Sequence, residues 1–170
     1  LKLNTTGIKN IAIGLNTLAA NTTGNQNIAM GDQALKANTT GVQNVSVGDS
    51  ALTANTEGTR NTAIGEQALS AHESGDRNIG LGYQAGDTIT TGSQNTFLGY
   101  GTDGISSANN QIAIGHLSVT TGQYGIAIGD NVSAATNDCV IGKNGATITV
   151  DFDADATWAQ ASDVRKKRNI

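Results

Sequence analysis

Apolar and polar residues alternate in short segments along most of the chain, and these segments recur at a fixed spacing. Each segment reads Gly-x-x-Asn, then Ile, Val or Thr, a mostly small residue, a large aliphatic residue and Gly, in six consecutive copies 17 residues apart. In an extended chain Ile11 and Ile13 share one side, while Asn10, Ala12 and Gly14 share the other. Alternation with a period of two inside a longer fixed period predicts one strand per coil of a parallel β-solenoid.

Two residue types mark the repeat. The asparagines that precede the strands are Asn10, Asn27, Asn44, Asn61, Asn78 and Asn95. The glycines that close the strands are Gly14, Gly31, Gly48, Gly65, Gly82 and Gly99. Further closing glycines at Gly115, Gly129 and Gly142 shorten the steps to 16, 14 and 13 residues and bring the prediction to about nine coils. A helical repeat is the competing interpretation, but fixed Gly and Asn positions would weaken a helix.

The asparagine row is predicted to be structural, because stacked asparagine side chains hydrogen-bond along a solenoid; polar ligand binding is the alternative. One side of the strands carries bulky aliphatic residues, and the other carries mostly Ala, Ser and Gly. We expect the bulky side to fill the interior of each coil and the small side to be covered by neighbouring chains. Two or three large apolar residues per coil make a thin core, which favours several identical chains around one axis.

Composition and charge exclude several classes of function. Aromatic residues make up 4% of the chain and charged residues 14%, which argues against both an ordinary globular core and a disordered chain. Before Asp163 there are 6 basic and 13 acidic residues, a net charge of −7, so no nucleic-acid partner is expected. No apolar run approaches the roughly 20 residues that cross a bilayer, so no membrane insertion is expected either.

The repeat resembles those of known fibrous proteins. The segment Asn61-Thr62-Ala63-Ile64-Gly65-Glu66-Gln67-Ala68-Leu69 is similar to the head repeats of trimeric autotransporter adhesins and, more closely, to the shaft repeats of phage tail fibres. This resemblance covers residues 7–145 and implies an all-β, left-handed parallel β-roll in an intertwined homotrimer. It implies a structural or receptor-attachment segment of a viral tail fibre, with a host-surface glycan or protein as receptor. The alternative is the head domain of an adhesin on a bacterial cell surface.

The last nine residues resemble a second family. Ser162-Asp163-Val164-Arg165-Lys166-Lys167-Arg168-Asn169-Ile170 is similar to the opening of the endosialidase-type intramolecular chaperone, Ser-Asp-x-Arg-x-Lys-x-x-Ile. The resemblance implies cleavage between Ser162 and Asp163, with Ser162 as nucleophile and Lys167 as its base. A solvated run of charges is the alternative. The predicted organisation is a repeat region over 1–145, a terminal strand and linker over 146–162, and the start of a cleavable chaperone over 163–170.

Other chemistry is not predicted. A solenoid enzyme that cuts glycans needs paired carboxylates in a groove, whereas the acidic residues here are scattered along the coils. Asp151, Asp153 and Asp155 alternate, but no glycine-rich calcium loop surrounds them, so neither metal nor cofactor is expected. His72 occupies an asparagine position of the repeat, and Cys139 is expected to be a buried, inert thiol. Few aromatic residues could contact a glycan: Tyr83, Phe97, Tyr100 and Tyr124.

Overall fold

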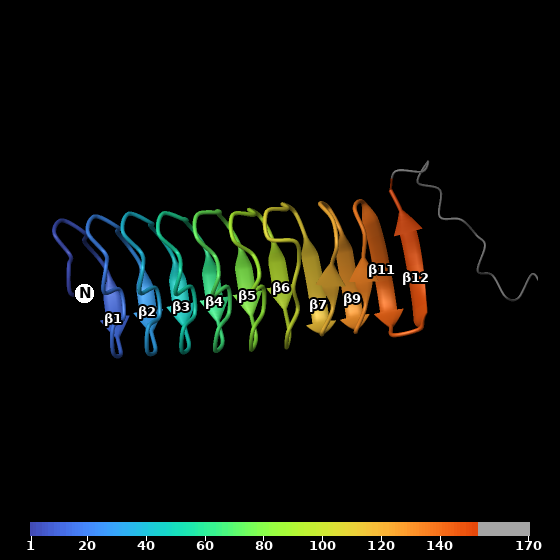
Figure 1. Cartoon of the computed structure of the whole chain (residues 1–170), viewed down its shortest axis with the longest axis horizontal. Coiled ribbons are helices and arrows are strands. Elements are labelled where there is room, and N and C mark those ends of the chain that lie inside the picture. Colours follow the sequence, from blue (N-terminus) through green and yellow to red (C-terminus); the bar gives the residue numbers. More distant parts are fainter. Residues whose placement is uncertain (153–170) are drawn as a thin grey trace, which may run out of the picture.

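The computed structural model describes residues 1–152, which form a stack of coils that follow one another in sequence order (Figure 1). Ten strands make one sheet in the order β1-β2-β3-β4-β5-β6-β7-β9-β11-β12, and β8 pairs with β10 in a second, two-stranded sheet. The first nine strands of the large sheet are parallel, so eight turns of the chain connect them. No helix occurs within these residues. The predicted all-β parallel solenoid is therefore confirmed, while the left-handed winding and the homotrimer stay predictions.

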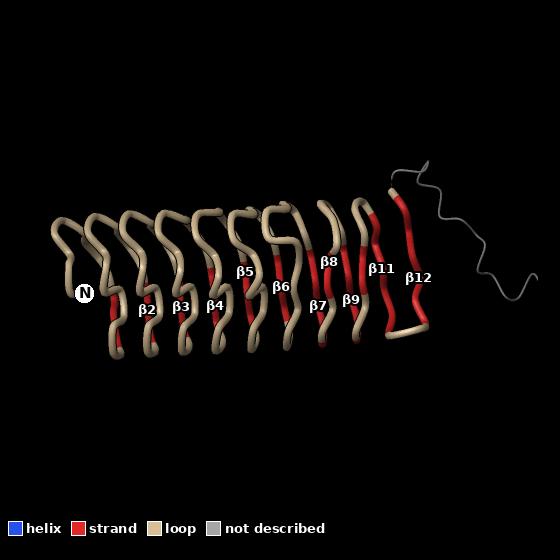
Figure 2. The backbone as a smooth tube through the Cα atoms, in the orientation of Figure 1, coloured by secondary structure: helices blue, strands red, loops and turns tan. Residues whose placement is uncertain are grey.

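The strands are short, and long loops separate them (Figure 2). Their bounds are β1 Ile11–Ile13, β2 Ile28–Met30, β3 Val45–Val47, β4 Thr62–Ile64, β5 Ile79–Leu81, β6 Thr96–Leu98, β7 Ile112–His116, β8 Val119–Thr120, β9 Ile126–Asp130, β10 Ser133–Ala134, β11 Asp138–Lys143 and β12 Ala146–Asp151.

Equivalent residues of successive repeats lie next to one another in the sheet. Ile11 pairs with Ile28, and Ile13 pairs with Met30, so a step of one repeat in the sequence is one strand in space. From β7 onward the coils shorten and the strands lengthen, because fewer loop residues remain between closing glycines. Here β8 and β10 add a second sheet on another side of the coil.

The two sides of the strands face opposite to our expectation. The small residues point inward: Ala29, Ala63 and Ala113 are 0% exposed. The bulky residues point outward, with Ile11 48% and Ile13 55% exposed. The prediction that the bulky side fills the coil was therefore wrong, and the small side is not an exposed seam.

The physical reason is that each coil is too narrow for two large side chains. One leucine from the opposite side of the coil already fills the interior of each of the first four coils, and all four are fully buried: Leu18, Leu35, Leu52 and Leu69. Gly80 lies in the small row, and even a methyl group there would lie 2.8 Å from Leu69 Cγ. The positions opposite the leucines therefore take only small residues: Ala29, Ser46 and Ala63 in other coils, and Gly at position 80.

One position breaks this rule and is compensated. Gly86 stands where the leucine of the next coil would be, and Phe97 stands in the small row of the following coil. Phe97 is fully buried, and a methyl group added at Gly86 would lie 2.6 Å from its Cδ2 atom. The aromatic ring thus occupies the space that the missing leucine leaves.

The closing glycines are required by backbone geometry. Gly31 has a φ of +131°, a conformation that other residues rarely adopt, and its added methyl group would collide with the carbonyl oxygen of Gly48 in the next coil. The same conformation recurs at the other closing glycines. A side chain here would force neighbouring coils apart.

A hairpin ends the described part of the chain. β12 runs antiparallel to β11, with Ile148 opposite Ile141 and Val150 opposite Cys139. The predicted final strand after residue 145 is thus present and belongs to the same sheet as the repeats. Within residues 1–152 there is no helix long and apolar enough to cross a membrane.

Candidate interaction surface

The outward side of the sheet carries two parallel rows of mostly aliphatic residues, which we name the outer apolar face. The first row consists of Ile11, Ile28, Val45, Thr62, Ile79, Thr96, Ile112, Ile126 and Cys139. The second row consists of Ile13, Met30, Val47, Ile64, Leu81, Leu98, Ile114, Ile128 and Ile141. All are exposed or half-buried, and Ile148 of β12, 62% exposed, extends the second row.

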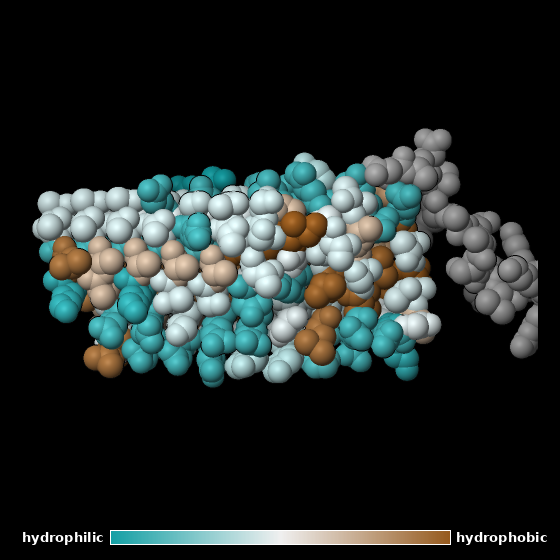
Figure 3. Space-filling view, in the orientation of Figure 1, coloured by the Kyte–Doolittle hydropathy of each residue, from teal (hydrophilic) through white to brown (hydrophobic). Residues whose placement is uncertain are grey.

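The outer apolar face is large for a soluble single chain. Monomeric proteins seldom expose contiguous apolar patches beyond a few hundred Å². Eighteen side chains at this exposure amount to on the order of 1,000 Å², close to the roughly 800 Å² that each partner buries in a standard stable interface. The face seen in Figure 3 is mainly pale or teal over the N-terminal coils and carries a single tan row, with brown only in separate patches.

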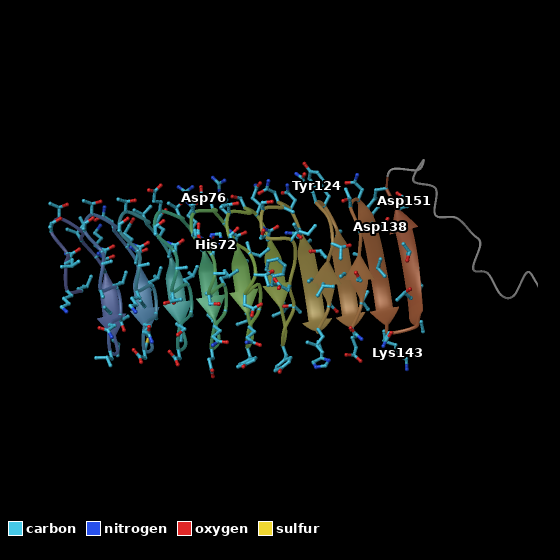
Figure 4. The ribbon with its side chains drawn as sticks, viewed as in Figure 1. His72, Asp76, Tyr124, Asp138, Lys143 and Asp151 are labelled. Atoms are coloured by element: carbon cyan, nitrogen blue, oxygen red, sulfur yellow. The ribbon has the colours of Figure 1, made fainter. Side chains whose placement is uncertain are left out.

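Two rows of mostly polar residues border the outer apolar face. The strand-start rim lies two positions before the first row and consists of Lys9, Gln26, Gln43, Arg60, Arg77, Gln94, Asn110, Tyr124 and Asn137. The strand-end rim lies two positions after the second row and consists of Leu15, Asp32, Asp49, Glu66, Tyr83, Tyr100, His116, Asp130 and Lys143. Figure 4 shows Tyr124 at one end of the strands and Lys143 at the other, so the rims border opposite edges of the face.

Part of the strand-end rim is internally connected. The rings of Tyr83 and Tyr100 stack with centroids 5.2 Å apart, and Tyr100 lies 5.5 Å from the His116 ring. His116 Nδ1 lies 2.7 Å from Asp130 Oδ1. Because the two tyrosine rings face each other along the stack, those faces are not free to receive a sugar. Phe97, another aromatic candidate, is fully buried.

The regular spacing of the asparagines corresponds to an internal hydrogen-bond ladder. Asn44 Nδ2 donates to the Gly58 carbonyl at 2.8 Å, and Asn44 Oδ1 accepts from the Asn61 backbone N–H at 2.9 Å. The Asn44 backbone N–H in turn donates to Asn27 Oδ1 at 2.9 Å. These groups are buried and occupied by one another, so this row has a structural role and offers no groups to a ligand.

A second internal ladder runs through another corner of the coil and is interrupted by His72. Asn38 Nδ2 donates to Asn21 Oδ1, and Asn55 Nδ2 donates to Asn38 Oδ1, each at 2.8 Å. His72 Nε2 lies 2.8 Å from the Gly75 carbonyl oxygen and therefore carries the proton. Its Nδ1 atom and Asn55 Oδ1 are buried without a partner. Burial lowers the pKa of His72, so it is a neutral ladder residue rather than an accessible base.

One half-buried carboxyl, that of Asp103, has a raised pKa. Burial raises the pKa of Asp103 to about 6, and the charge of Asp87 shifts it in the same direction. The Asp103 carboxylate accepts a hydrogen bond from the Gly104 backbone N–H at 2.8 Å. Among residues 1–152 no three His, Cys, Asp or Glu side chains come together as metal ligands.

The predicted site residues have different outcomes. Ser162, Asp163 and Lys167 lie outside the described residues, as do Asp153 and Asp155. Cys139 is half-buried on the outer apolar face, so the prediction of a buried thiol was wrong. The two rims were missed because alternation applies only within the strands: every residue of the strand-start rim has a positive φ, for example 59° at Arg60, and the strand-end rim follows the positive-φ closing glycines.

Comparisons of this chain with protein-family models, with curated proteins and with solved structures each returned no match. The outer apolar face and its rims are therefore interpreted from their own geometry and chemistry.

Proposed function

We propose that this chain is a structural, receptor-attachment segment of a homotrimeric fibre of the phage tail-fibre type, whose copies pack through their outer apolar faces. The single observation that supports this most is the double row of exposed aliphatic side chains on a coil whose own interior is already full. Apolar surface of this extent is unfavourable in water unless something covers it.

A further copy of the same chain is the partner that fits the face best. The face repeats one pair of side chains at each strand, at the roughly 4.8 Å spacing of a sheet. A parallel copy has the same spacing and presents an identical apolar row at each level, whereas an unrelated surface would fall out of step. The number three comes from the resemblance of the repeat to trimeric shafts and heads.

The proposed role is mechanical projection, with contact to a host-surface glycan or protein at the virion's attachment end. Every coil is joined to the next by backbone hydrogen bonds and by the asparagine ladders, which suits a rigid rod. A bacterial adhesin head would use the same architecture, and an anchor region in the same gene would favour it over neighbouring virion genes. Catalysis is not part of the proposal, except for chaperone release at Ser162–Asp163.

The test is the solution mass of the purified chain by light scattering, with and without charges on the face. We expect a species of three chains that resists heat and detergent, and a monomer with an unchanged circular dichroism spectrum for Ile64→Asp/Leu81→Asp. Thr23→Asp/Thr40→Asp, at exposed positions outside the strands, is the matched control and should remain assembled. A wild-type chain that is a folded monomer at high concentration would refute the proposal.

A further inference from the structure

We propose that the two rims form a charge-complementary seam, in which the basic strand-start rim of one copy lies against the acidic strand-end rim of the next. This inference rests on the proposed assembly and specifies how its copies are paired. The principal partners are Arg60 and Arg77 on one copy and Asp49 and Glu66 on its neighbour.

The first observation is that charge is segregated between the rims. The strand-start rim holds three cations, Lys9, Arg60 and Arg77, and no acidic residue. Over the first four coils the strand-end rim holds three acidic residues, Asp32, Asp49 and Glu66, and no cation. The two rims are separated by the full width of the outer apolar face.

The second observation is that these charges have no ionic partner within their own chain. Across residues 1–152 the only ion pair is that of His116 with Asp130. Arg60 Nε donates to Gln43 Oε1 at 3.1 Å, and Asp49 accepts from the Ser50 hydroxyl at 3.2 Å, so both contact only neutral groups. Asp49 and Glu66 also lie in adjacent coils, where their like charges repel each other in the single chain.

Symmetry then decides which rims meet. Rotation of parallel copies about a shared axis brings the strand-start rim of one chain to the strand-end rim of the next at every seam. Face-to-face antiparallel packing instead brings each rim against its own kind, basic to basic and acidic to acidic. The charge layout thus favours parallel, cyclic association and disfavours the antiparallel alternative.

Basic and acidic rim residues can pair both when neighbouring copies are level and when one copy is shifted along the solenoid axis by one coil. With copies level, Arg60 lies opposite Glu66 and Arg77 lies opposite Tyr83, whose ring can receive a guanidinium. With an offset of one coil, Arg60 lies opposite Asp49 and Arg77 lies opposite Glu66. In both registers the apolar rows form the centre of the interface and the charged rims its border, as in other protein interfaces.

Three sets of substitutions test the seam in the full chain. Asp49→Lys/Glu66→Lys makes both rims basic, and Arg60→Glu/Arg77→Glu makes both rims acidic. The combined quadruple variant exchanges the charges of the two rims. All four positions are exposed, so the fold should be retained, which circular dichroism checks. Glu57→Lys/Glu73→Lys, at exposed acidic positions outside both rims, gives the same change in net charge as Asp49→Lys/Glu66→Lys and is the control for that variant.

At low salt we expect each rim variant to assemble at least about tenfold more weakly than the wild type, with partial recovery at high salt because screening reduces repulsion. The quadruple variant should assemble like the wild type, yet differently tagged wild-type and quadruple chains refolded together should not mix in native mass spectrometry. If the wild type is oligomeric and the rim variants also assemble fully and mix freely with it, the seam is overturned and the proposed assembly still stands. A monomeric wild type would overturn both.

Discussion

Removal of one side chain from the buried asparagine ladder should cost far more than removal of the same side chain at the end of the ladder. Asn44→Ala leaves the Asn61 backbone N–H without its partner and leaves the Gly58 carbonyl with only the bond from Asn55 Nδ2, and both residues are buried. Asn10→Ala removes the equivalent two bonds, to Gly24 and Asn27, but Asn10 itself is only half-buried. Water can replace the lost partners more readily there.

The expected magnitude follows from the number of buried groups left unpaired. The unpaired N–H costs about 1–3 kcal/mol and the bond lost at Gly58 about 1 kcal/mol, so Asn44→Ala should lower the free energy of unfolding by about 2–4 kcal/mol. For Asn10→Ala we expect about 1 kcal/mol, because Asn10 is half-buried at the end of the ladder and water can enter its place to pair with the groups that it leaves. The two variants remove the same atoms, so the difference isolates burial.

The assay is chemical denaturation followed by circular dichroism at one fixed protein concentration, since assembly adds to apparent stability. Repeating it with Ile64→Asp/Leu81→Asp as the starting chain separates folding of the coil from association. Equal losses for Asn10→Ala and Asn44→Ala, or a loss near zero at Asn44, would show that the ladder does not carry the stability assigned to it.

Three further predictions concern the interior. Phe97→Ala should cost about 3–5 kcal/mol of unfolding free energy, and adding Gly86→Leu should recover part of it, whereas Gly86→Leu alone should destabilise; a double-mutant cycle with no coupling would contradict the compensation. Burial lowers the folded-state pKa of His72, so protonation of this residue favours the unfolded chain, and the free energy of unfolding should fall as the pH falls below about 6.5. His72→Asn should remove this pH dependence and raise the free energy of unfolding by about 1 kcal/mol. The pKa of Asp103 is raised to about 6 in the folded chain, so ionisation of this carboxyl favours the unfolded chain, and the free energy of unfolding should fall as the pH rises from about 4 through 6. Asp103→Asn should therefore be more stable than the wild type at pH 7, which thermal unfolding measures.

Local chemistry along the chain was sufficient to predict the coil itself. The strands begin where alternation begins, and the fixed asparagines and glycines identify positions that must stack. Gly31 illustrates why this works: its φ of +131° and its contact with Gly48 are required at every step of the stack, so the constraint repeats in the sequence. His72 was correctly placed in a ladder for the same reason.

Pairs of residues that compensate for each other were not predictable in this way. Gly86 and Phe97 are 11 positions apart and each breaks the repeat. They appear as two unrelated exceptions until the coils are stacked and the ring is found in the space of the missing leucine. The rims are a similar case, because their opposite charges acquire meaning only when both edges of one face are seen together.

The sequence by itself determined the repeat, the strand positions and the existence of two unlike sides. Only the tertiary structure decided which side faces inward, because alternation distinguishes the sides without giving the width of the coil. That width is set by the opposite side, where Leu35 and its equivalents already fill the interior. The small residues therefore lie inside, and the bulky ones face outward to form the surface on which the proposed function depends.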